Sequence, residues 1–147
     1  MKDIFAPLYE LFFYDGNYSV IFDVLYIDGG YITFGLLFIL IPLFFNLLFY
    51  FVWRYPYGRF WHWLLWNIIS TVTVFGITYS CANTAIFGST DQNLLKALGD
   101  TASGYEQYAN SLPIKYACLN GCLALLVGFI YSIFLKQFSK IQIHLPF

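Results

Sequence analysis

Charge is the scarcest property of this sequence. Only 10% of its 147 residues are Asp, Glu, Lys or Arg, whereas 60% are hydrophobic and 23% are aromatic. An average soluble protein is roughly 25% charged. So few charged groups cannot cover a soluble domain, and the mean hydropathy of +0.67 predicts an integral membrane protein with a single small domain. A net charge of −1 provides no positive field for a phosphate backbone, which excludes nucleic acid as a partner.

Motifs of catalysis and cofactor binding are also missing. The sequence has no Gly-rich phosphate loop, no CxxC pair and no HExxH motif, and no Ser/His/Asp or Cys/His set lies at neighbouring positions. Its three cysteines share no metal-ligand spacing with its two histidines. We therefore expect no enzyme activity, no cofactor and no metal site. Cys81, Cys118 and Cys122 are expected to be buried free thiols that act as small apolar residues.

Three long apolar runs, residues 30–53, 61–87 and 114–135, have no ionisable side chain in their central parts. Proton pumps and ion-coupled transporters keep such a group in the hydrocarbon layer, because it must bind the ion there. Three spans also provide no inverted repeat of the kind that secondary transporters use. These absences argue against ion-coupled transport.

The same three runs predict three transmembrane helices, since each reaches the roughly 20 residues that a spanning helix needs. Residues 1–29 contain two further apolar runs, 4–14 and 18–27, which are about half as long and are punctuated by acids. We expect two short segments that lie in the membrane interface or against the bundle. The predicted fold class is an all-α integral membrane protein with three transmembrane helices and interfacial N-terminal segments.

The connection between the first two spans, residues 54–60, is typical of a membrane-surface turn. Pro56 and Gly58 stop helix propagation there. Arginine is held on the cytoplasmic side of membranes, and Trp and Tyr prefer the interfacial belts. The predicted interface anchors are Trp53, Arg54, Arg59, Trp61, Trp63, Tyr105 and Tyr108.

Segregation of charge predicts the orientation in the membrane. The 54–60 turn and the 136–147 tail hold four Lys or Arg residues and no acid. The other side holds three bases, Lys2, Lys96 and Lys115, and its segments 1–29 and 88–113 hold all eight acids, which support the assignment. Because Lys and Arg near span ends mark the cytoplasmic side, we expect the N-terminus outside and the C-terminus in the cytoplasm. The membrane would be a plasma membrane or a bacterial inner membrane.

The predicted outer loop, 88–113, ends at Pro113, after which the third span begins. Within it, residues 91–98 have the pattern of a short amphipathic helix. Thr90 or Asp91 would serve as its N-cap and Gly99 as its stop.

The second span carries more polar groups than the other two. Hydroxyls and amides that face acyl chains lose hydrogen bonds, so its polar side should face protein or water and its apolar stripe should face lipid. Asn46 and Asn67 lie at similar depths and are predicted to face each other, sharing a hydrogen bond or a water. The apolar stripe comprises Leu64, Ile68, Val72, Phe75 and Tyr79. The predicted intramembrane polar residues are Asn46, Asn67, Ser70, Thr71, Thr78, Asn83 and Asn120.

Small residues at three- and four-residue spacing form a ridge on the third span. Such a ridge allows the backbone of another helix to approach closely. The partner helix could belong to this chain or to another subunit. The predicted helix-packing residues are Ala117, Gly121, Ala124, Gly128 and Ser132.

The ridge and the polar second span suggest more packing surface than three helices need. The leading hypothesis is therefore a non-catalytic anchor, scaffold or accessory subunit of a larger membrane assembly, whose partners are lipid and other membrane subunits or copies of itself. Tyr105 and Tyr108 would anchor a partner on the outer side. The alternative is an oligomeric pore whose path is lined by the Ser/Thr/Asn face of the second span, and a membrane enzyme acting on lipid is a third possibility.

Overall fold

The computed structural model describes residues 2–53, 60–100 and 103–139, and within these ranges the chain is helical with short turns and no strand. Its α-helices are α1 (Lys2–Phe13), α2 (Ser19–Ile27), α3 (Gly30–Leu47), α4 (Phe60–Phe87), α5 (Gln92–Gly99) and α6 (Tyr105–Lys136). A 3₁₀ turn, η1 (Gly16–Tyr18), joins α1 to α2, and a π-helical turn, η2 (Leu48–Val52), extends α3.

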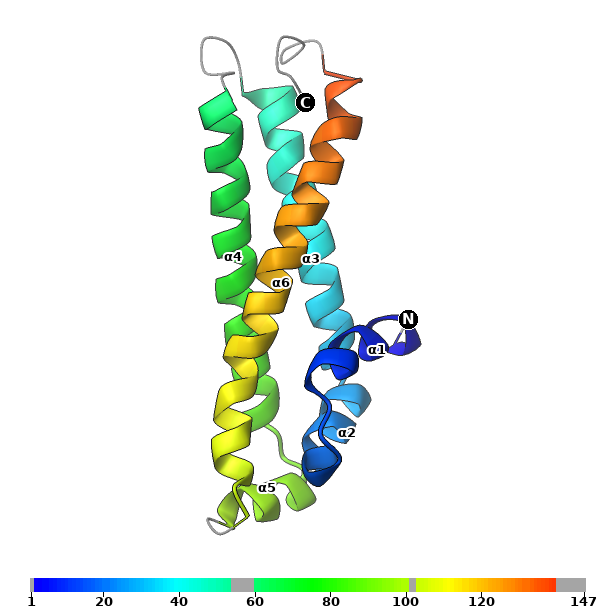
Figure 1. Ribbon diagram of the computed structural model, residues 1–147, viewed down its shortest axis with the longest axis vertical. Helices are drawn as coiled ribbons and strands as arrows, with labels where there is room; N and C mark the ends of the chain where they lie inside the picture. The colour runs from blue at the N-terminus through cyan, green and yellow to red at the C-terminus, as the bar shows by residue number, and fades with distance from the viewer. Residues whose placement is uncertain (1, 54–59, 101–102, 140–147) are drawn as a thin grey trace.

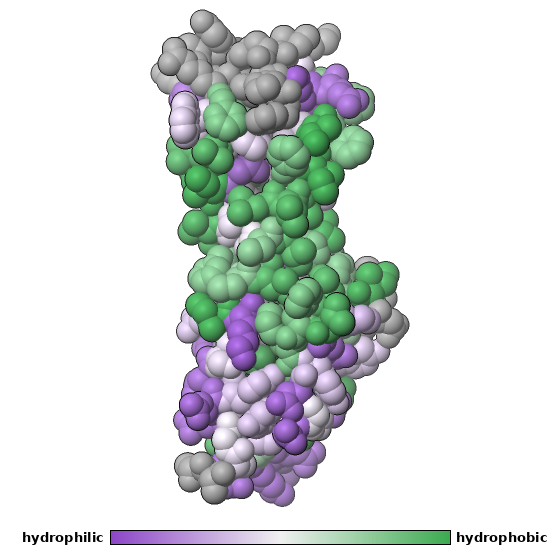
Figure 2. Space-filling model, viewed as in Figure 1, coloured by the Kyte–Doolittle hydropathy of each residue, from purple (hydrophilic) through white to green (hydrophobic). Residues whose placement is uncertain are grey.

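Three of these helices form the long bundle seen in Figure 1: α3 with η2, α4, and α6. The segments Gly30–Val52, Phe60–Phe87 and Tyr105–Lys136 are each long and apolar enough to cross a membrane. The prediction of an all-helical chain with three such helices is confirmed. On the face seen in Figure 2 a broad apolar belt crosses the bundle, and the hydrophilic surface gathers toward one end.

That hydrophilic end holds the short helices. There α2 and α5 lie against the ends of the long helices, while α1 crosses the bundle rather than running along it (Figure 1). We call this part, made of α1, η1, α2, α5 and residues 105–113, the acidic end. The opposite part, where η2 ends, α4 begins and α6 finishes, is the turn end.

The third long helix starts earlier than expected. It begins at Tyr105, so residues 105–113 belong to α6 and not to a loop, and Pro113 lies inside the helix. Proline is unfavourable in a helix interior because its backbone nitrogen has no hydrogen to donate to the carbonyl one turn earlier. Here Leu112, Pro113 and Tyr116 are all buried, and tertiary packing overrides that preference.

The short helix of the acidic end agrees with its predicted capping. α5 begins after Asp91, whose carboxylate accepts hydrogen bonds from the backbone N–H groups of Asn93 (2.8 Å) and Leu94 (3.0 Å). These bonds satisfy two of the N–H groups that a helix N-terminus leaves without partners. Leu94 is buried beneath the cap, which fixes the orientation of the helix.

An aromatic core holds the acidic end together. Tyr9 of α1 stacks on Tyr31 of α3 with ring centroids 5.6 Å apart, and it meets Tyr116 of α6 edge-on at 5.6 Å. All three rings are fully or almost fully buried. Such pairs add about 0.5–1.5 kcal/mol each beyond the burial of area. These contacts hold α1 against the long helices.

The three thiols are free, as expected, but their burial is not as predicted. Cys118 and Cys122 are exposed on α6, and Cys81 is half-buried. The inward face of α6 is occupied by the small residues Ala117 and Gly121, so the two cysteines one position further along the chain are turned outward.

Candidate functional site

Asn120 forms the centre of a buried polar network that joins four helices. Its Oδ1 accepts a hydrogen bond from the Tyr9 hydroxyl of α1 at 2.6 Å. Its Nδ2 donates to the Phe34 carbonyl of α3 and to the Thr78 hydroxyl of α4, each at 3.0 Å. Asn120, Tyr9 and Thr78 are all completely buried. The amide thus uses both of its groups for structure and leaves none for a ligand.

Burial changes the acidity of Tyr9, which lies on α1 outside the three long helices. Removal from water disfavours the phenolate, and this raises the pKa of the Tyr9 hydroxyl. Tyr9 therefore stays protonated and serves as a hydrogen-bond donor to Asn120.

A second polar centre lies nearer the turn end. Trp63 Nε1 of α4 donates to the Ser132 hydroxyl of α6 at 2.6 Å. The single proton of Ser132 can go to Asn46 Oδ1 on α3 or to the Gly128 carbonyl, each at 2.9 Å. Asn46, Trp63 and Ser132 are buried, so this group also ties the three long helices together.

Asn46 and Asn67 approach Gly128 of α6 from different helices. A methyl group added at Gly128 would lie 2.5 Å from Asn67 Oδ1 and 3.6 Å from Asn46 Nδ2. Their hydrogen bonds differ from the shared bond that we predicted. Asn46 Nδ2 donates to the Pro42 carbonyl at 2.9 Å and Asn67 Nδ2 to the Trp63 carbonyl at 3.0 Å. Each amide donor is thus satisfied within its own helix.

The small-residue ridge of α6 is used inside the chain. All five of its members are buried, and α6 packs on both α3 and α4. At Gly121 an added methyl group would lie 3.7 Å from Thr71 Cγ2, an ordinary contact, whereas Gly128 has no such room. The ridge therefore provides no surface for a second subunit. Its members are Ala117, Gly121, Ala124, Gly128 and Ser132.

The polar residues of α4 divide between the interior and the surface. Asn67, Ser70 and Thr78 are buried in the bundle. The hydroxyls of Thr71, Thr73 and Ser80 donate to backbone carbonyls four residues earlier, at 2.9, 2.8 and 3.0 Å. These three hydroxyls are therefore satisfied without a partner from another helix and without water. Asn83 is exposed near the helix end, and the stripe residues Ile68, Val72 and Tyr79 are exposed as expected. The other two stripe residues, Leu64 and Phe75, are half-buried, because Leu64 packs against the cluster of Phe49, Tyr50 and Trp63 and Phe75 lies near Gly121 of α6.

The predicted interface anchors are found in several environments. Trp61 is 73% exposed, Trp63 is buried, and Trp53 packs against Trp66 with ring centroids 5.3 Å apart. Arg54 and Arg59 lie outside the described residues.

Tyr105 and Tyr108 contact the N-terminal segment of the same chain. The Tyr18 ring stacks on Tyr108 at 4.2 Å and meets Tyr105 edge-on at 4.9 Å, while the Tyr108 hydroxyl donates to the Phe13 carbonyl. Both rings are half-buried by these contacts. Their aromatic surface is largely engaged within the chain and offers little to a partner.

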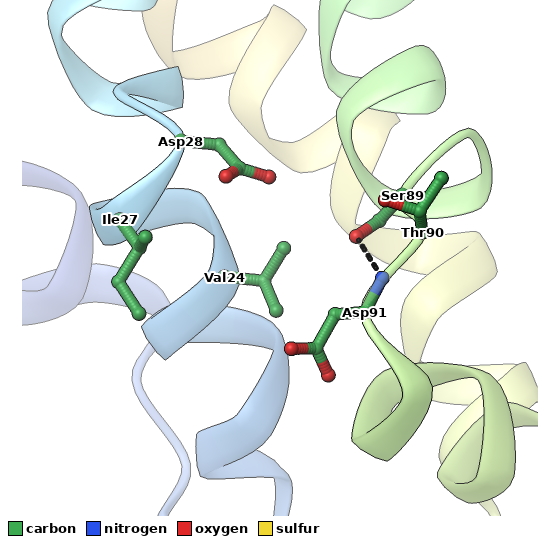
Figure 3. A pocket seen from close by; sticks show the side chains of 6 residues that line it. All are labelled: Val24, Ile27, Asp28, Ser89, Thr90 and Asp91. Carbon is green, nitrogen blue, oxygen red and sulfur yellow. Dashed lines mark hydrogen bonds between the residues drawn. The ribbon is translucent and has the colours of Figure 1, made fainter.

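A cleft at the acidic end separates α2 from the start of α5 (Figure 3). It consists of two adjoining pockets of about 200 and 490 Å³ that share Val24, Ile27 and Asp91. We call it the α2–α5 cleft. Its remaining lining residues are Val20, Asp23, Tyr26, Asp28, Ser89, Thr90 and Asn93.

Three carboxylates line this cleft, Asp23, Asp28 and Asp91, and the last two enter it from opposite walls. In Figure 3 the Asp28 side chain extends from the end of α2 and the Asp91 side chain extends from the start of α5. Asp28 is exposed, and Ile27 beside it is 69% exposed. Ser89 Oγ accepts a hydrogen bond from the Asp91 backbone N–H at 3.2 Å, which fixes the second wall. The arrangement combines negative charge with an exposed aliphatic side chain.

Sequence reasoning missed this cleft. The sequence predicts Asp91 as a helix cap and places Asp28 among the acids of residues 1–29, and it leaves Asp23, inside the 18–27 run, as either a solvated or capping carboxylate or a functional one. Nothing in the spacing of residues 28 and 91 indicates that α2 packs beside α5.

No group of three or more His, Cys, Asp or Glu side chains within the described ranges could hold a metal ion. Comparison of the chain with protein families, curated proteins and solved structures finds no match. The chemistry of the cleft and the polar centres is therefore the basis for any functional assignment.

Proposed function

We propose that the protein is an integral membrane protein with its acidic end outside the cytoplasm. The apolar belt around three long helices supports insertion, because lipid can cover the exposed side chains there. Lys136 ends α6 at the turn end, and Arg54 and Arg59 belong to the connection between α3 and α4. Basic residues near span ends favour the cytoplasmic side.

The first helix has the character of an interfacial segment. α1 lies across the bundle, and its outward residues are apolar: Ile4 is 70%, Leu11 81% and Phe12 60% exposed. On the other side of the helix Tyr9 and Ala6 are buried against the long helices. A helix in this position can bury its outer face at the boundary between headgroups and acyl chains.

Within the membrane we propose a non-catalytic role, as an anchor or accessory subunit of a larger assembly. The polar groups around Asn120 and Ser132 are committed to hydrogen bonds between helices. The α2–α5 cleft is a concave surface of the acidic end that carboxylates line. It is the best candidate for the contact with the rest of the assembly.

The observation that carries this proposal is the pair of carboxylates across the cleft. Asp28 and Asp91 face the same space beside the exposed Ile27 (Figure 3). Complementary charge directs partners to a surface, and apolar anchors supply much of the binding energy. A partner segment with a Lys or Arg next to an apolar side chain would suit this cleft. The partner could be a different protein or another copy of this chain.

An oligomeric pore lined by α4 is less well supported. Its most polar face, with Asn67 and Thr78, packs inside the bundle. The outward hydroxyls of Thr73 and Ser80 bond to their own helix. These two outward hydroxyls need no aqueous path, and Ser70 is the residue of α4 whose buried hydroxyl has no hydrogen-bond partner in the described ranges.

Photo-crosslinking in native membranes tests the docking proposal. A photoreactive residue at position 27 should give a protein adduct, whose mass distinguishes a foreign subunit from a second copy. The double substitution Asp28→Asn, Asp91→Asn should abolish the adduct. Asparagine at position 91 keeps the helix cap, so the change removes charge without removing α5.

Two controls accompany that experiment. Glu106→Gln removes an exposed carboxylate of the same end outside the cleft and should leave the adduct intact. A photoreactive residue at Leu126, 62% exposed on the belt, should label lipid only. An adduct at position 126 but none at position 27 would mean that recognition occurs within the bilayer, and the cleft proposal would be wrong.

A further inference from the structure

A second concave surface lies on the apolar belt, between α1 and α6. It has a volume of about 330 Å³, within the size range of small-molecule sites. Phe13 of α1 forms one side, and the rest comes from α6. The α6 lining residues are Ile114, Lys115, Cys118, Leu119 and Cys122. We call it the α1–α6 groove, and Lys115 is the one charged side chain that lines it.

The groove begins at the level expected for lipid headgroups. Lys115 and Lys136 belong to the same continuous helix and are 21 residues apart. At about 1.5 Å per residue they are roughly 31 Å apart along the axis. The hydrocarbon core of a bilayer is about 30 Å thick. With Lys136 at one boundary, Lys115 falls at the other.

From that level the groove continues along one side of α6. Ile114, Cys118 and Cys122 follow each other at four-residue intervals and are exposed. Residues at this spacing share a helix face, so they form a continuous apolar track that points away from the acidic end. The track has the shape and polarity that an extended acyl chain requires.

Lys115 adds charge at the mouth of the track. It is half-buried, and its ammonium lies 5.0 Å from the centroid of the Tyr108 ring. No carboxylate within the described ranges forms an ion pair with it. A lysine held over an aromatic ring at headgroup depth can attract an anion from the lipid side.

We propose that the α1–α6 groove binds one phospholipid with an anionic headgroup. One acyl chain lies along Ile114, Cys118 and Cys122 against Phe13, and the phosphate meets the Lys115 ammonium. This site rests on the proposed membrane insertion but is independent of docking at the α2–α5 cleft. The bound lipid would contact both α1 and α6 and so stabilise their packing, in addition to the direct contacts of Tyr9.

Native mass spectrometry of the full chain in mild detergent tests the site. The probes are phosphatidylglycerol and phosphatidylcholine with identical acyl chains. We expect one bound phosphatidylglycerol, preferred over phosphatidylcholine. Lys115→Gln should reduce that preference about fivefold, the effect of roughly one basic residue at a charged membrane surface. Lys115→Arg should keep it, and Cys118→Phe should lower retention of both lipids by filling the track.

Matched variants exclude indirect effects. Lys96→Gln removes an exposed lysine of the acidic end, and Leu126→Phe enlarges an exposed belt residue outside the groove. Neither should change lipid retention. Equal retention of the two lipids by the unaltered chain, or equal effects of Lys115→Gln and Lys96→Gln, would overturn the proposal. A dimer without lipid would assign the groove to a second copy and would overturn it as well.

Extraction of membranes at alkaline pH distinguishes a failure of the lipid-site proposal from a failure of the proposed membrane insertion. A chain that resists extraction but shows no selective lipid overturns the groove site and leaves membrane insertion intact. A chain that is released by extraction overturns both.

Discussion

The Tyr9 hydroxyl and the Asn120 side-chain oxygen lie 2.6 Å apart, although 111 residues separate them in the sequence. This bond joins the first helix to the last. Thr78 and the Phe34 carbonyl complete the partners of the amide, so all four helices depend on one side chain. We expect this position to be among the most sensitive in the protein.

Asn120→Leu preserves approximate side-chain size and removes every hydrogen bond of the amide. Buried groups that lose their partners cost about 1–3 kcal/mol, and hydrogen bonds within membranes are worth roughly 0.6–2 kcal/mol. We expect a loss of about 1–2 kcal/mol in the free energy of unfolding, measured by thermal unfolding in detergent. Asn110→Leu, on an exposed position of the same helix, is the control. Equal effects of the two substitutions would contradict the role of Asn120.

Tyr9→Phe keeps the stacked ring and removes the hydroxyl. Because burial raises the folded-state pKa of Tyr9, the unfolded chain loses its proton first, near pH 10. The protonated hydroxyl therefore contributes stability below pH 10, and that contribution declines as the pH rises above this value. Tyr9→Phe should be less stable at pH 8 and should lose less stability between pH 9 and pH 11.

The matched control for this experiment is Tyr14→Phe, whose side chain is 56% exposed. Its stability should follow that of the unaltered chain over the same pH range. If Tyr9→Phe also shows the unaltered pH profile, then the Tyr9 hydroxyl is not the group that couples stability to alkaline pH.

Gly128, Gly121 and Gly76 form a graded series for close packing. An added methyl group meets Asn67 Oδ1 at 2.5 Å at position 128, meets Thr71 Cγ2 at 3.7 Å at position 121, and meets no atom within 4 Å at position 76. Gly128→Ala should destabilise the bundle by about 1–3 kcal/mol through overpacking. Gly121→Ala should be tolerated.

Gly76→Ala completes the series as the control. Alanine favours the helix over glycine by roughly 0.5–1 kcal/mol, so this change should be neutral or stabilising. Unfolding in detergent, followed by circular dichroism, measures all three variants. A loss at position 76 as large as that at position 128 would show that contact with Asn67 is not the cause.

Fusions at the C-terminus test the proposed orientation. A fluorescent protein placed after residue 147 should fold and fluoresce in the cytoplasm of a bacterial host, whereas alkaline phosphatase at the same site should be inactive. Active phosphatase would reverse the assignment and place the acidic end inside.

The long helices and the α5 cap were predictable because their signals are local. Uncharged runs mark the spans, and Asp91 is followed at once by the N–H groups that it caps. The start of α6 was not predictable, because the helix passes through Pro113 only where packing compensates for the missing donor. Sequence pattern also suggested that Tyr108 faces outward, since composition cannot show that Tyr18 stacks on it.

The polar residues illustrate the same limit. Depth along a span predicted that Asn46 and Asn67 would be neighbours, and both approach Gly128. Depth could not predict which acceptor each amide selects, because the carbonyl one turn earlier in the same helix is always available. Partners such as Tyr9 and Asn120, or Asp28 and Asp91, depend on how segments far apart in the chain are arranged.

The distance in sequence between Tyr9 and Asn120 also determines the order of assembly during synthesis. When the first helix leaves the ribosome, the residue that completes its packing has not yet been made. Residues 2–13 can pack on α3 as soon as that helix is made, through the contacts of Tyr9 with Tyr31 and Phe34. The contacts of Tyr9 with Tyr116 and Asn120 form only after α6 has been translated, so the last long helix completes the packing of the first helix.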